Sequence, residues 1–301
     1  MILSYYKEPN FGDAVNPMIF NHLLPGFFDK DESSLFLGIG SILGFIKGNE
    51  KTRRLIVFTS GHAYGKVPQI DKRYDIRCVR GPLTAKALNI SPALAITDGA
   101  VLLNLLPEFQ KPQEKKFRFS YIPHHRSEEI FDQLKEVLGE TGVNYISPKQ
   151  DPDKVIRQIR ESECVLAEAM HGAIIADAFR VPWIPVRMFK HINAFKWKDW
   201  AMSMETQYQP ETITSLFSEA WIKRILDQKL NFDNTGILSR AFTPLYKKYQ
   251  DYRREKMFVR DIRRIMEKEP FLSSEELVKS RTDQLMGVLE GIKRDYKREA
   301  V

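Results

Sequence analysis

One stretch of the sequence, residues 164–182, constrains the fold more than any other. It reads CVLAEAMHGAIIADAFRVP, which predicts a short apolar strand over Cys164–Ala167 and then a helix of small apolar residues that begins at His171. A strand that leads into a helix N-terminus presents free backbone N–H groups and the positive end of the helix dipole, where α/β proteins bind anions. We therefore expect Glu168, His171 and Gly172 to belong to a ligand site, with Gly172 allowing a ligand to approach the backbone. The alternative is a buried histidine in an ordinary turn.

Five predicted strands in the first hundred residues each end in polar or glycine residues. The strands are Ile2–Tyr6, Ser34–Ile39, Leu55–Thr59, Ile76–Val79 and Ala95–Thr97. The residues that follow them are Asn10 and Asp13, Gly40 and Ser41, Ser60 and Gly61, Arg80, and Asp98. Because the carboxyl ends of parallel strands meet at one edge of a sheet, we expect these residues to form a polar rim where a ligand binds. Asn10 or Asp13 could instead cap the helix expected over Ala14–Leu24.

A segment rich in proline and charge, residues 107–116, is the strongest candidate for a domain boundary. A second α/β series follows it, with strands at Phe117–Ile122, Asn144–Ile146, Cys164–Ala167 and Trp183–Arg187, and helices at Ile130–Leu138 and from Asp151 to about Ser162. His124 and His125 follow the first of these strands and belong to the expected site. No HxH or HExxH spacing accompanies them, so we expect no metal. The sequence therefore predicts two α/β domains, over residues 1–108 and 117–235.

Composition, charge and cysteine content indicate the compartment and the partners to expect. Hydrophobic residues make up 43% of the 301 residues and charged residues 28%, which is typical of a soluble globular protein. The two cysteines, Cys78 and Cys164, both lie in apolar runs and fit a reducing cytoplasm better than a disulfide framework. Neither a signal peptide nor a membrane span is expected. Five of the seven net positive charges lie beyond residue 238, so the body is nearly neutral and no nucleic-acid partner is expected.

The remaining residues, 236–301, predict a basic helical extension. Residues 244–268 have amphipathic helical spacing, and Ser273 with Glu276 forms a capping box for a second helix. Two interpretations remain open: a helical pair packed on the body, or a basic face that lies against an anionic membrane.

The motifs NFGD, GIGSIL, RGPLTAKAL, DGAVLL and AEAMHGAIIADA occur in the order found in the polysaccharide pyruvyl transferase family. The sequence most resembles its exopolysaccharide ketal-pyruvate transferase branch, over about Ser4–Trp200. The resemblance implies an α/β protein with two Rossmann-like domains similar to GT-B glycosyltransferases, followed here by the C-terminal helical extension. It implies phosphoenolpyruvate as donor and no other cofactor. The implied acceptor is a sugar of a lipid-linked oligosaccharide or growing polysaccharide of capsule or exopolysaccharide type. The cysteine usage predicts a cytoplasmic location, and the basic extension allows a peripheral position on the inner face of the plasma membrane.

The resemblance also assigns residues to the donor pocket. The family arginine at the RGP turn corresponds to Arg80, and only the histidine of the family's Arg-x-His corner is present, as His171. Ala169 stands where the arginine would be. Arg126, Arg187 and Lys196 are candidates to supply the lost charge. Lys196 is preferred because it lies in the aromatic and basic segment KHINAFKWKDW, which could act as a lid or simply close the domain as an aromatic cluster.

Ketal formation determines which groups the pocket needs. The methylene carbon of phosphoenolpyruvate is protonated, two sugar hydroxyls add, and phosphate leaves, which calls for a general acid, a base and cations for the anionic donor. His171 changes charge near neutral pH and suits the acid, with Glu168 holding its imidazolium. Asp13 or Asp98 could be the base.

We expect the donor cleft between the domains, with Arg80 and His171 on opposite walls. The alternatives are a nucleotide-sugar glycosyltransferase of the same fold and a non-catalytic scaffold of polysaccharide assembly.

Overall fold

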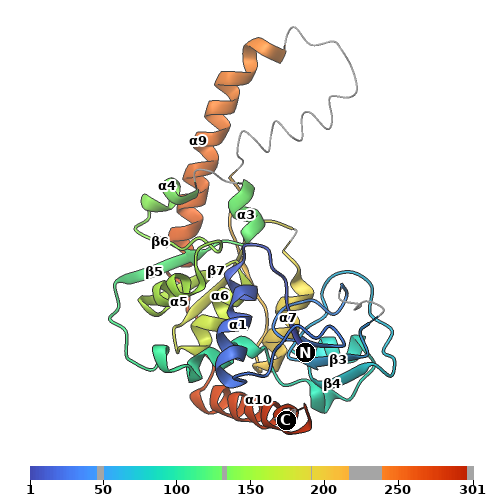
Figure 1. Cartoon of the computed structure of the whole chain (residues 1–301). Helices are drawn as coiled ribbons and strands as arrows, with labels where there is room; N and C mark the ends of the chain where they lie inside the picture. Colours follow the sequence, from blue (N-terminus) through green and yellow to red (C-terminus); the bar gives the residue numbers. More distant parts are fainter. Residues whose placement is uncertain (46–50, 131–133, 191, 217–238, 297–301) are drawn as a thin grey trace.

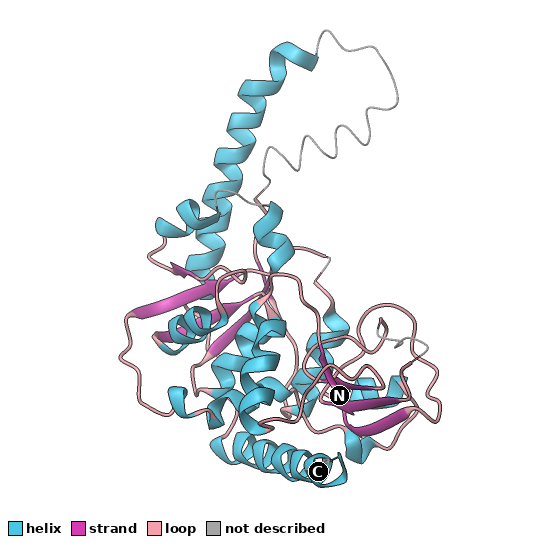
Figure 2. Ribbon diagram, in the orientation of Figure 1, coloured by secondary structure: helices cyan, strands magenta, loops and turns pink. Residues whose placement is uncertain are grey.

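The computed structural model describes residues 1–45, 51–130, 134–190, 192–216 and 239–296, and contains two parallel sheets with helices packed around them (Figures 1 and 2). The first sheet has the order β1 (Ile2–Ser4), β2 (Ser34–Leu37), β3 (Arg54–Phe58), β4 (Tyr74–Cys78). The second has the order β6 (Asn144–Tyr145), β5 (Phe117–Ile122), β7 (Ser162–Ala167), β8 (Trp183–Arg187), β9 (Glu211–Thr212). Every pairing between these strands is parallel. The predicted α/β class is confirmed.

Helices and short 3₁₀ turns connect the strands. The α-helices are α1 (Phe11–Leu23), α2 (Pro82–Ala87), α3 (His125–Ile130), α4 (Leu134–Gly139), α5 (Pro152–Arg160), α6 (Met170–Ala178), α7 (Ala194–Ser203), α9 (Ser239–Ile265) and α10 (Glu275–Tyr296). Short 3₁₀ turns form η1 (Pro92–Leu94), η2 (Gly99–Leu105) and η3 (Pro107–Phe109). Asp151 caps α5 by accepting a hydrogen bond from the backbone N–H of Asp153, with Pro152 in the first turn.

Three predicted elements differ from the structure. Ala95–Thr97 is not a strand: Ala95 makes one isolated bridge to Val79, and helical turns begin on both sides of it. The helix predicted over Ile130–Leu138 is divided between α3 and α4, and residues 131–133 lie outside the described part of the chain. The capping serine of α10 is Ser274, whose hydroxyl accepts from the N–H of Leu277, and not Ser273.

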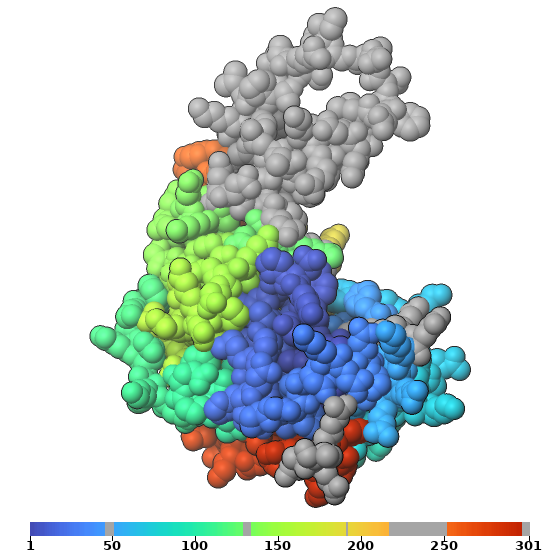
Figure 3. Space-filling view, viewed as in Figure 1, coloured from blue at the N-terminus to red at the C-terminus, as the bar shows by residue number. Residues whose placement is uncertain are grey.

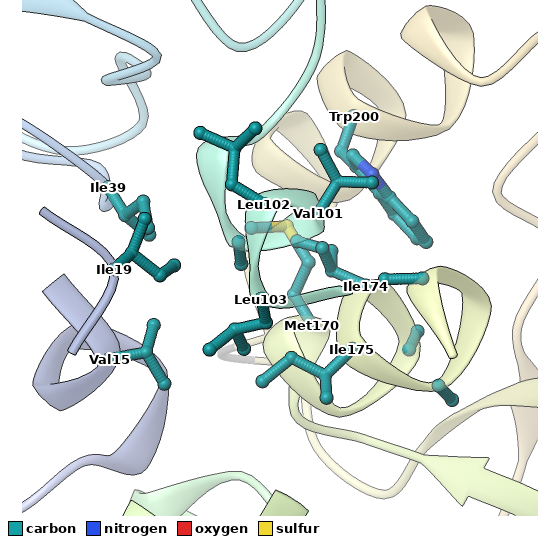
Figure 4. Packing of buried hydrophobic residues seen from close by; sticks show 14 of the residues in the cluster. Val15, Ile19, Ile39, Val101, Leu102, Leu103, Met170, Ile174, Ile175 and Trp200 are labelled. Atoms are coloured by element: carbon teal, nitrogen blue, oxygen red, sulfur yellow. The ribbon is translucent and has the colours of Figure 1, made fainter. Parts of the chain in front are cut away.

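The largest buried hydrophobic cluster extends through both halves of the chain. Val15 and Ile19 of α1 pack with Leu102 and Leu103 of η2 and with Ile174, Ile175 and their neighbours on α6 (Figure 4). Such side chains each contribute about 1.5–3 kcal/mol when fully buried. In the space-filling view the N-terminal segment, dark blue, lies between the green surface of the second half and the lighter blue of the first (Figure 3). The predicted boundaries at residues 108, 117 and 236 stay a prediction, and residue 236 lies outside the described part of the chain.

The two C-terminal helices pack on different halves of the body. On α9, Phe258, Val259, Ile262 and Ile265 are buried in the cluster that includes strand residues of the second sheet. From α10, Asp295 forms an ion pair with Arg77 of β4 at 2.6 Å, and Val278, Leu285 and Leu289 join the central cluster. Packing on the body, one of the two interpretations left open, is therefore confirmed for residues 252–296. The side chains of residues 239–251 lie outside the description. None of the described helices is both long and apolar enough to cross a bilayer.

Candidate active site

A cleft of about 200 Å³ lies where the carboxyl ends of strands from both sheets meet. Seven of the predicted site residues line it, together with Ala169, Arg126 and several aromatic side chains. Those seven are Asn10, Asp13, Ser41, His124, His125, His171 and Lys196. Within the described residues the other seven lie behind this lining: Gly40, Ser60, Gly61, Arg80, Asp98, Glu168 and Gly172. The rule that polar residues at strand ends converge therefore identifies the region, but it does not say which side chains face the cleft.

His171 stands at the start of α6, directly after β7, and its ring packs on the backbone of Gly12. A Cβ atom at Gly12 would lie 2.0 Å from the imidazole Nδ1, so only glycine fits there. On its other side His171 faces Asp98, with 3.7 Å between Nε2 and Oδ2, a distance that makes an ion pair when the imidazole is protonated. Neither of these two atoms has a hydrogen-bond partner among the described residues.

Asp98 is fully buried and its carboxylate faces the His171 imidazole. Burial by itself would raise the pKa of Asp98, but contact with His171 and the positive charges of His171 and Arg80 bring that pKa below its ordinary value. The structure therefore corrects the expectation that Glu168 holds the imidazolium. Glu168 instead accepts hydrogen bonds from the backbone N–H groups of His124 at 2.9 Å and Met188 at 3.0 Å, which tie together three strand ends.

Asp13 lies on the cleft side of the histidine. Burial raises its pKa, and the charges of His171 and Lys196 oppose only part of that rise. Asn10 precedes α1 but does not cap it: its amide donates to the Asp13 carboxylate. The loop after β2 reaches the same carboxylate through Gly40, where φ is +124° and a Cβ atom would lie 2.7 Å from Oδ1 of Asp13. Of the two candidate bases, Asp13 alone lines the described cleft.

Arg80 does not stand on the cleft wall as predicted. Its guanidinium is fully buried, with Nε 3.0 Å from the carboxylate of Asp199 and Nη1 donating to the hydroxyl of Ser41 at 2.7 Å. It lies flat on Gly61, where a Cβ atom would be 2.2 Å from Cζ. Asp199 lies 119 residues away on α7, so no sequence pattern could have revealed this pair. Arg80 reaches the cleft only through Ser41.

Two other predicted site residues, Ser60 and Gly172, make contacts within the fold and do not line the described cleft. The Ser60 hydroxyl donates to the carbonyl of Leu37 at 3.1 Å and so joins the ends of β3 and β2. Gly172 faces Ile122 of β5, with a Cβ position 3.0 Å from Cδ1, and allows α6 to approach the sheet rather than a ligand.

Cations and histidines complete the lining. Lys196, on α7, has its Nζ 5.7 Å from the centre of the Tyr64 ring, and Arg126 follows β5. Arg187 is half-buried at the end of β8 and does not belong to the described lining. The rings of His124 and His125 lie 4.2 Å apart. Within the part of the chain that the structure describes, no three His, Cys, Asp or Glu side chains are grouped as metal ligands would be.

Sequence reasoning missed five residues of this region: Gly12, the ion-pair partner Asp199, and the aromatic residues Tyr6, Phe45 and Tyr64. None of them has a recognisable sequence spacing relative to the polar residues that it contacts or surrounds. Gly12 lies inside a motif that was noted, NFGD, but only the folded chain shows that His171 packs on it.

Comparison with known proteins gives two matches. A sequence model described as polysaccharide pyruvyl transferase matches residues 57–188. Over 225 residues the chain is 42% identical to the succinoglycan biosynthesis protein ExoV of Rhizobium meliloti (strain 1021), an alignment that covers 73% of this chain and 70% of that protein. No solved structure matches the chain significantly.

Proposed function

This chain belongs to the polysaccharide pyruvyl transferase family, and from that premise we propose that it moves pyruvate from phosphoenolpyruvate, as a ketal, onto a sugar of a lipid-linked or growing exopolysaccharide. One observation carries the proposal: the His171 imidazole faces a buried carboxylate, Asp98, and lines the same cleft as a second carboxylate, Asp13, whose pKa it influences. Such an arrangement suits the delivery of one proton and the removal of another at neighbouring atoms.

The donor is held by its charges. Phosphoenolpyruvate carries a carboxylate and a phosphate, and the described lining offers the cations Lys196 and Arg126 together with the N-terminus of α6. Lys196 stands in for the arginine that Ala169 replaces. A charge-assisted hydrogen bond contributes about 1.5–3 kcal/mol, so one well-placed ammonium is enough to restore much of the lost affinity.

In the proposed reaction His171 first gives a proton to the donor and later accepts one from the sugar. His171 protonates the methylene carbon, and one sugar hydroxyl bonds to the adjacent cationic carbon while Asp13 takes that hydroxyl's proton. The second hydroxyl attacks as the bond between this carbon and the phosphate oxygen breaks, and its proton returns to His171. The leaving phosphate takes the proton that Asp13 had accepted, so both residues return to their starting states and the ketal is the other product. Asp98 acts through His171 and is a positioning residue.

The location at the membrane is part of this proposal. The outward face of α9 carries the exposed side chains of Arg253, Lys256, Arg260 and Arg263, which would attract the anionic lipid around a lipid-linked acceptor. We also propose that the two halves of the chain are Rossmann-like domains similar to those of GT-B glycosyltransferases. Two such domains would have a cleft between them.

Donor choice and proton delivery test the function. Isothermal titration should detect binding of phosphoenolpyruvate but not of UDP-glucose, GDP-mannose or CMP-sialic acid. In deuterated water the pyruvyl methyl of the product should gain one deuterium, and His171→Asn should lower turnover by about 10²–10⁴-fold while the donor still binds. Binding of a nucleotide sugar without binding of phosphoenolpyruvate would favour the glycosyltransferase alternative. Binding of neither would favour the scaffold.

A further inference from the structure

Three aromatic side chains at the rim of the cleft have no evident role in folding. Seven large apolar side chains among the described residues are exposed, and two of them, Tyr6 at 50% and Phe45 at 60%, line this one small cleft. Tyr64 lies beside Phe45 in the same lining. Exposed aromatic rings beside a cleft of polar groups are typical of a surface that meets a ligand.

The pair formed by Phe45 and Tyr64 is built by the backbone. Their rings stack at 6.2 Å between centres, with 27° between the planes. The loops that carry them touch through two glycines: a Cβ atom at Gly44 would lie 1.8 Å from the carbonyl oxygen of Tyr64, and Gly65 has φ +73° with its Cβ position 2.7 Å from the carbonyl oxygen of Gly44. The two rings are therefore held side by side before any ligand arrives.

The chemistry of these rings fits a sugar better than it fits the anionic donor. An aromatic face carries negative charge from its quadrupole, so it repels phosphoenolpyruvate and attracts groups with positive character. A pyranose has a face of C–H groups of that kind, and its hydroxyls project from the ring edge. The cations Lys196 and Arg126 and the carboxylate of Asp13 line the same cleft and would serve the donor and the hydroxyls.

We propose that Tyr6, Phe45 and Tyr64 form the acceptor subsite, a platform on which a pyranose ring stacks while two of its hydroxyls reach Asp13 and the bound donor. The assignment rests on the proposed function, because it divides the cleft between donor and acceptor. It predicts that donor and acceptor affinities respond to different residues. The substrate class is a pyranoside whose two reacting hydroxyls lie at one edge of the ring.

Saturation-transfer NMR with methyl β-D-glucopyranoside and methyl β-D-galactopyranoside tests the platform, with phosphoenolpyruvate bound. The wild type should transfer saturation to the ring C–H protons of at least one glycoside. Phe45→Ala and Tyr6→Ala should each weaken that binding about tenfold, or about 1.4 kcal/mol, while Phe45→Trp retains it. Tyr252→Ala removes an aromatic ring of similar exposure (53%) on α9 and is the matched control. The dissociation constant of phosphoenolpyruvate should stay within twofold of wild type in all four variants.

The results separate this assignment from the proposed function. If phosphoenolpyruvate fails to bind but a glycoside binds in its absence and Phe45→Ala abolishes that binding, the donor proposal fails and the platform stands. If phosphoenolpyruvate binds and the glycoside signal is missing or unchanged by both alanine variants, the platform is wrong. Loss of phosphoenolpyruvate or UDP-glucose affinity in Phe45→Ala would also overturn it, because the rings would then belong to the donor.

Discussion

The two carboxylates beside His171 have pKa values shifted in opposite directions. Asp98 is fully buried, yet the positive charges of His171 and Arg80 keep its pKa below the ordinary range. Asp13 is raised by burial, which its cationic neighbours only partly offset. Pairs of groups whose surroundings separate their pKa values in this way usually have different roles. The residue that stays charged positions the histidine, and the residue that readily takes a proton suits the base.

Replacing Asp98 should change the pH dependence of turnover more than donor binding. Without the carboxylate the imidazolium loses its counter-ion, so Asp98→Asn should lower kcat about 10-fold to 100-fold and move the alkaline limb of the pH–rate profile to lower pH. Steady-state rates between pH 5 and 9 measure this. Asp177→Asn removes another buried carboxylate, one bonded to Trp183, and should lower Tm without moving that limb. An unmoved limb in Asp98→Asn would make Asp98 a purely structural residue.

Replacing Asp13 should stabilise the protein while it abolishes transfer. A raised folded-state pKa means that the folded chain binds the proton more tightly than the unfolded chain, so stability falls as pH rises from the unfolded value of 3.8 through the folded one. At pH 7 the ionised carboxylate therefore lowers stability, and Asp13→Asn should raise Tm by a few degrees. The difference should shrink as pH approaches 4. A lower Tm for Asp13→Asn at pH 7 would contradict this account.

The candidate site shows which parts of a site a sequence can predict. Strand-end chemistry identified Asp13, Ser41 and His171, because polar residues at the carboxyl ends of parallel strands converge whatever the details of packing. It failed for Arg80 and Glu168, whose partners come from distant segments and turn them away from the ligand. Whether a polar side chain faces a cleft or lies behind it depends on contacts that leave no local pattern.

At the scale of elements, α7 joins the two halves of the site. Lys196 and Asp199 lie three residues apart on this helix, and the first lines the cleft while the second binds Arg80 of the other half. Asp199 also accepts from the N–H and hydroxyl of Thr84 on α2, at 2.8 and 2.6 Å. The buried ion pair thus fixes the helix that presents the lysine.

A double-mutant cycle can distinguish anchoring from direct donor contact. Lys196→Ala should weaken phosphoenolpyruvate binding tenfold or more. Arg80→Lys should weaken it through displacement of α7, because an ammonium cannot reproduce the planar fork of N–H groups that bonds Asp199, Ser41 and the carbonyl of His62. In the Lys196→Ala background Arg80→Lys should then have little further effect. Lys198→Ala, exposed on the same helix, is the control. Effects that add in full would mean that Arg80 contacts the donor itself.

The outward face of α9 should bind anionic vesicles in a salt-sensitive way. Over the described side chains of α9, residues 252–265, Phe258 and Ile262 are buried against the body. The attraction to lipid therefore comes mainly from the exposed charges, at about 1 kcal/mol each. Arg253→Glu/Lys256→Glu/Arg260→Glu should abolish co-sedimentation with anionic vesicles at low salt. Lys72→Glu/Lys111→Glu/Lys279→Glu makes the same change in net charge elsewhere and should not. If both triple variants reduce co-sedimentation equally, the attraction to vesicles depends on net charge alone and not on the face of α9.

At the scale of the whole molecule, the shared core predicts a single unfolding transition. Ile19 on α1 is fully buried in the cluster that also contains Ile174 and Trp200 (Figure 4). Ile19→Ala should lower stability by about 2–5 kcal/mol. All four tryptophans lie beyond residue 180, so their fluorescence reports on the second half. Fluorescence and circular dichroism should nevertheless shift together in urea. Two separated transitions would mean that residues 1–108 and 117–235 unfold as independent domains.

The contact between β4 and α10 has a consequence for the newly made chain. Arg77 and Asp295 are 218 residues apart, and at about 5–20 residues per second the ribosome needs on the order of 10 to 45 s to make what lies between them. Throughout that time the surface of η2 and β4 that Leu285, Leu289 and Ile292 will cover stays open to solvent. The first sheet can form early, but the surface that α10 covers stays exposed until α10 has been made. During translation this apolar face is therefore open to aggregation until α10 covers it.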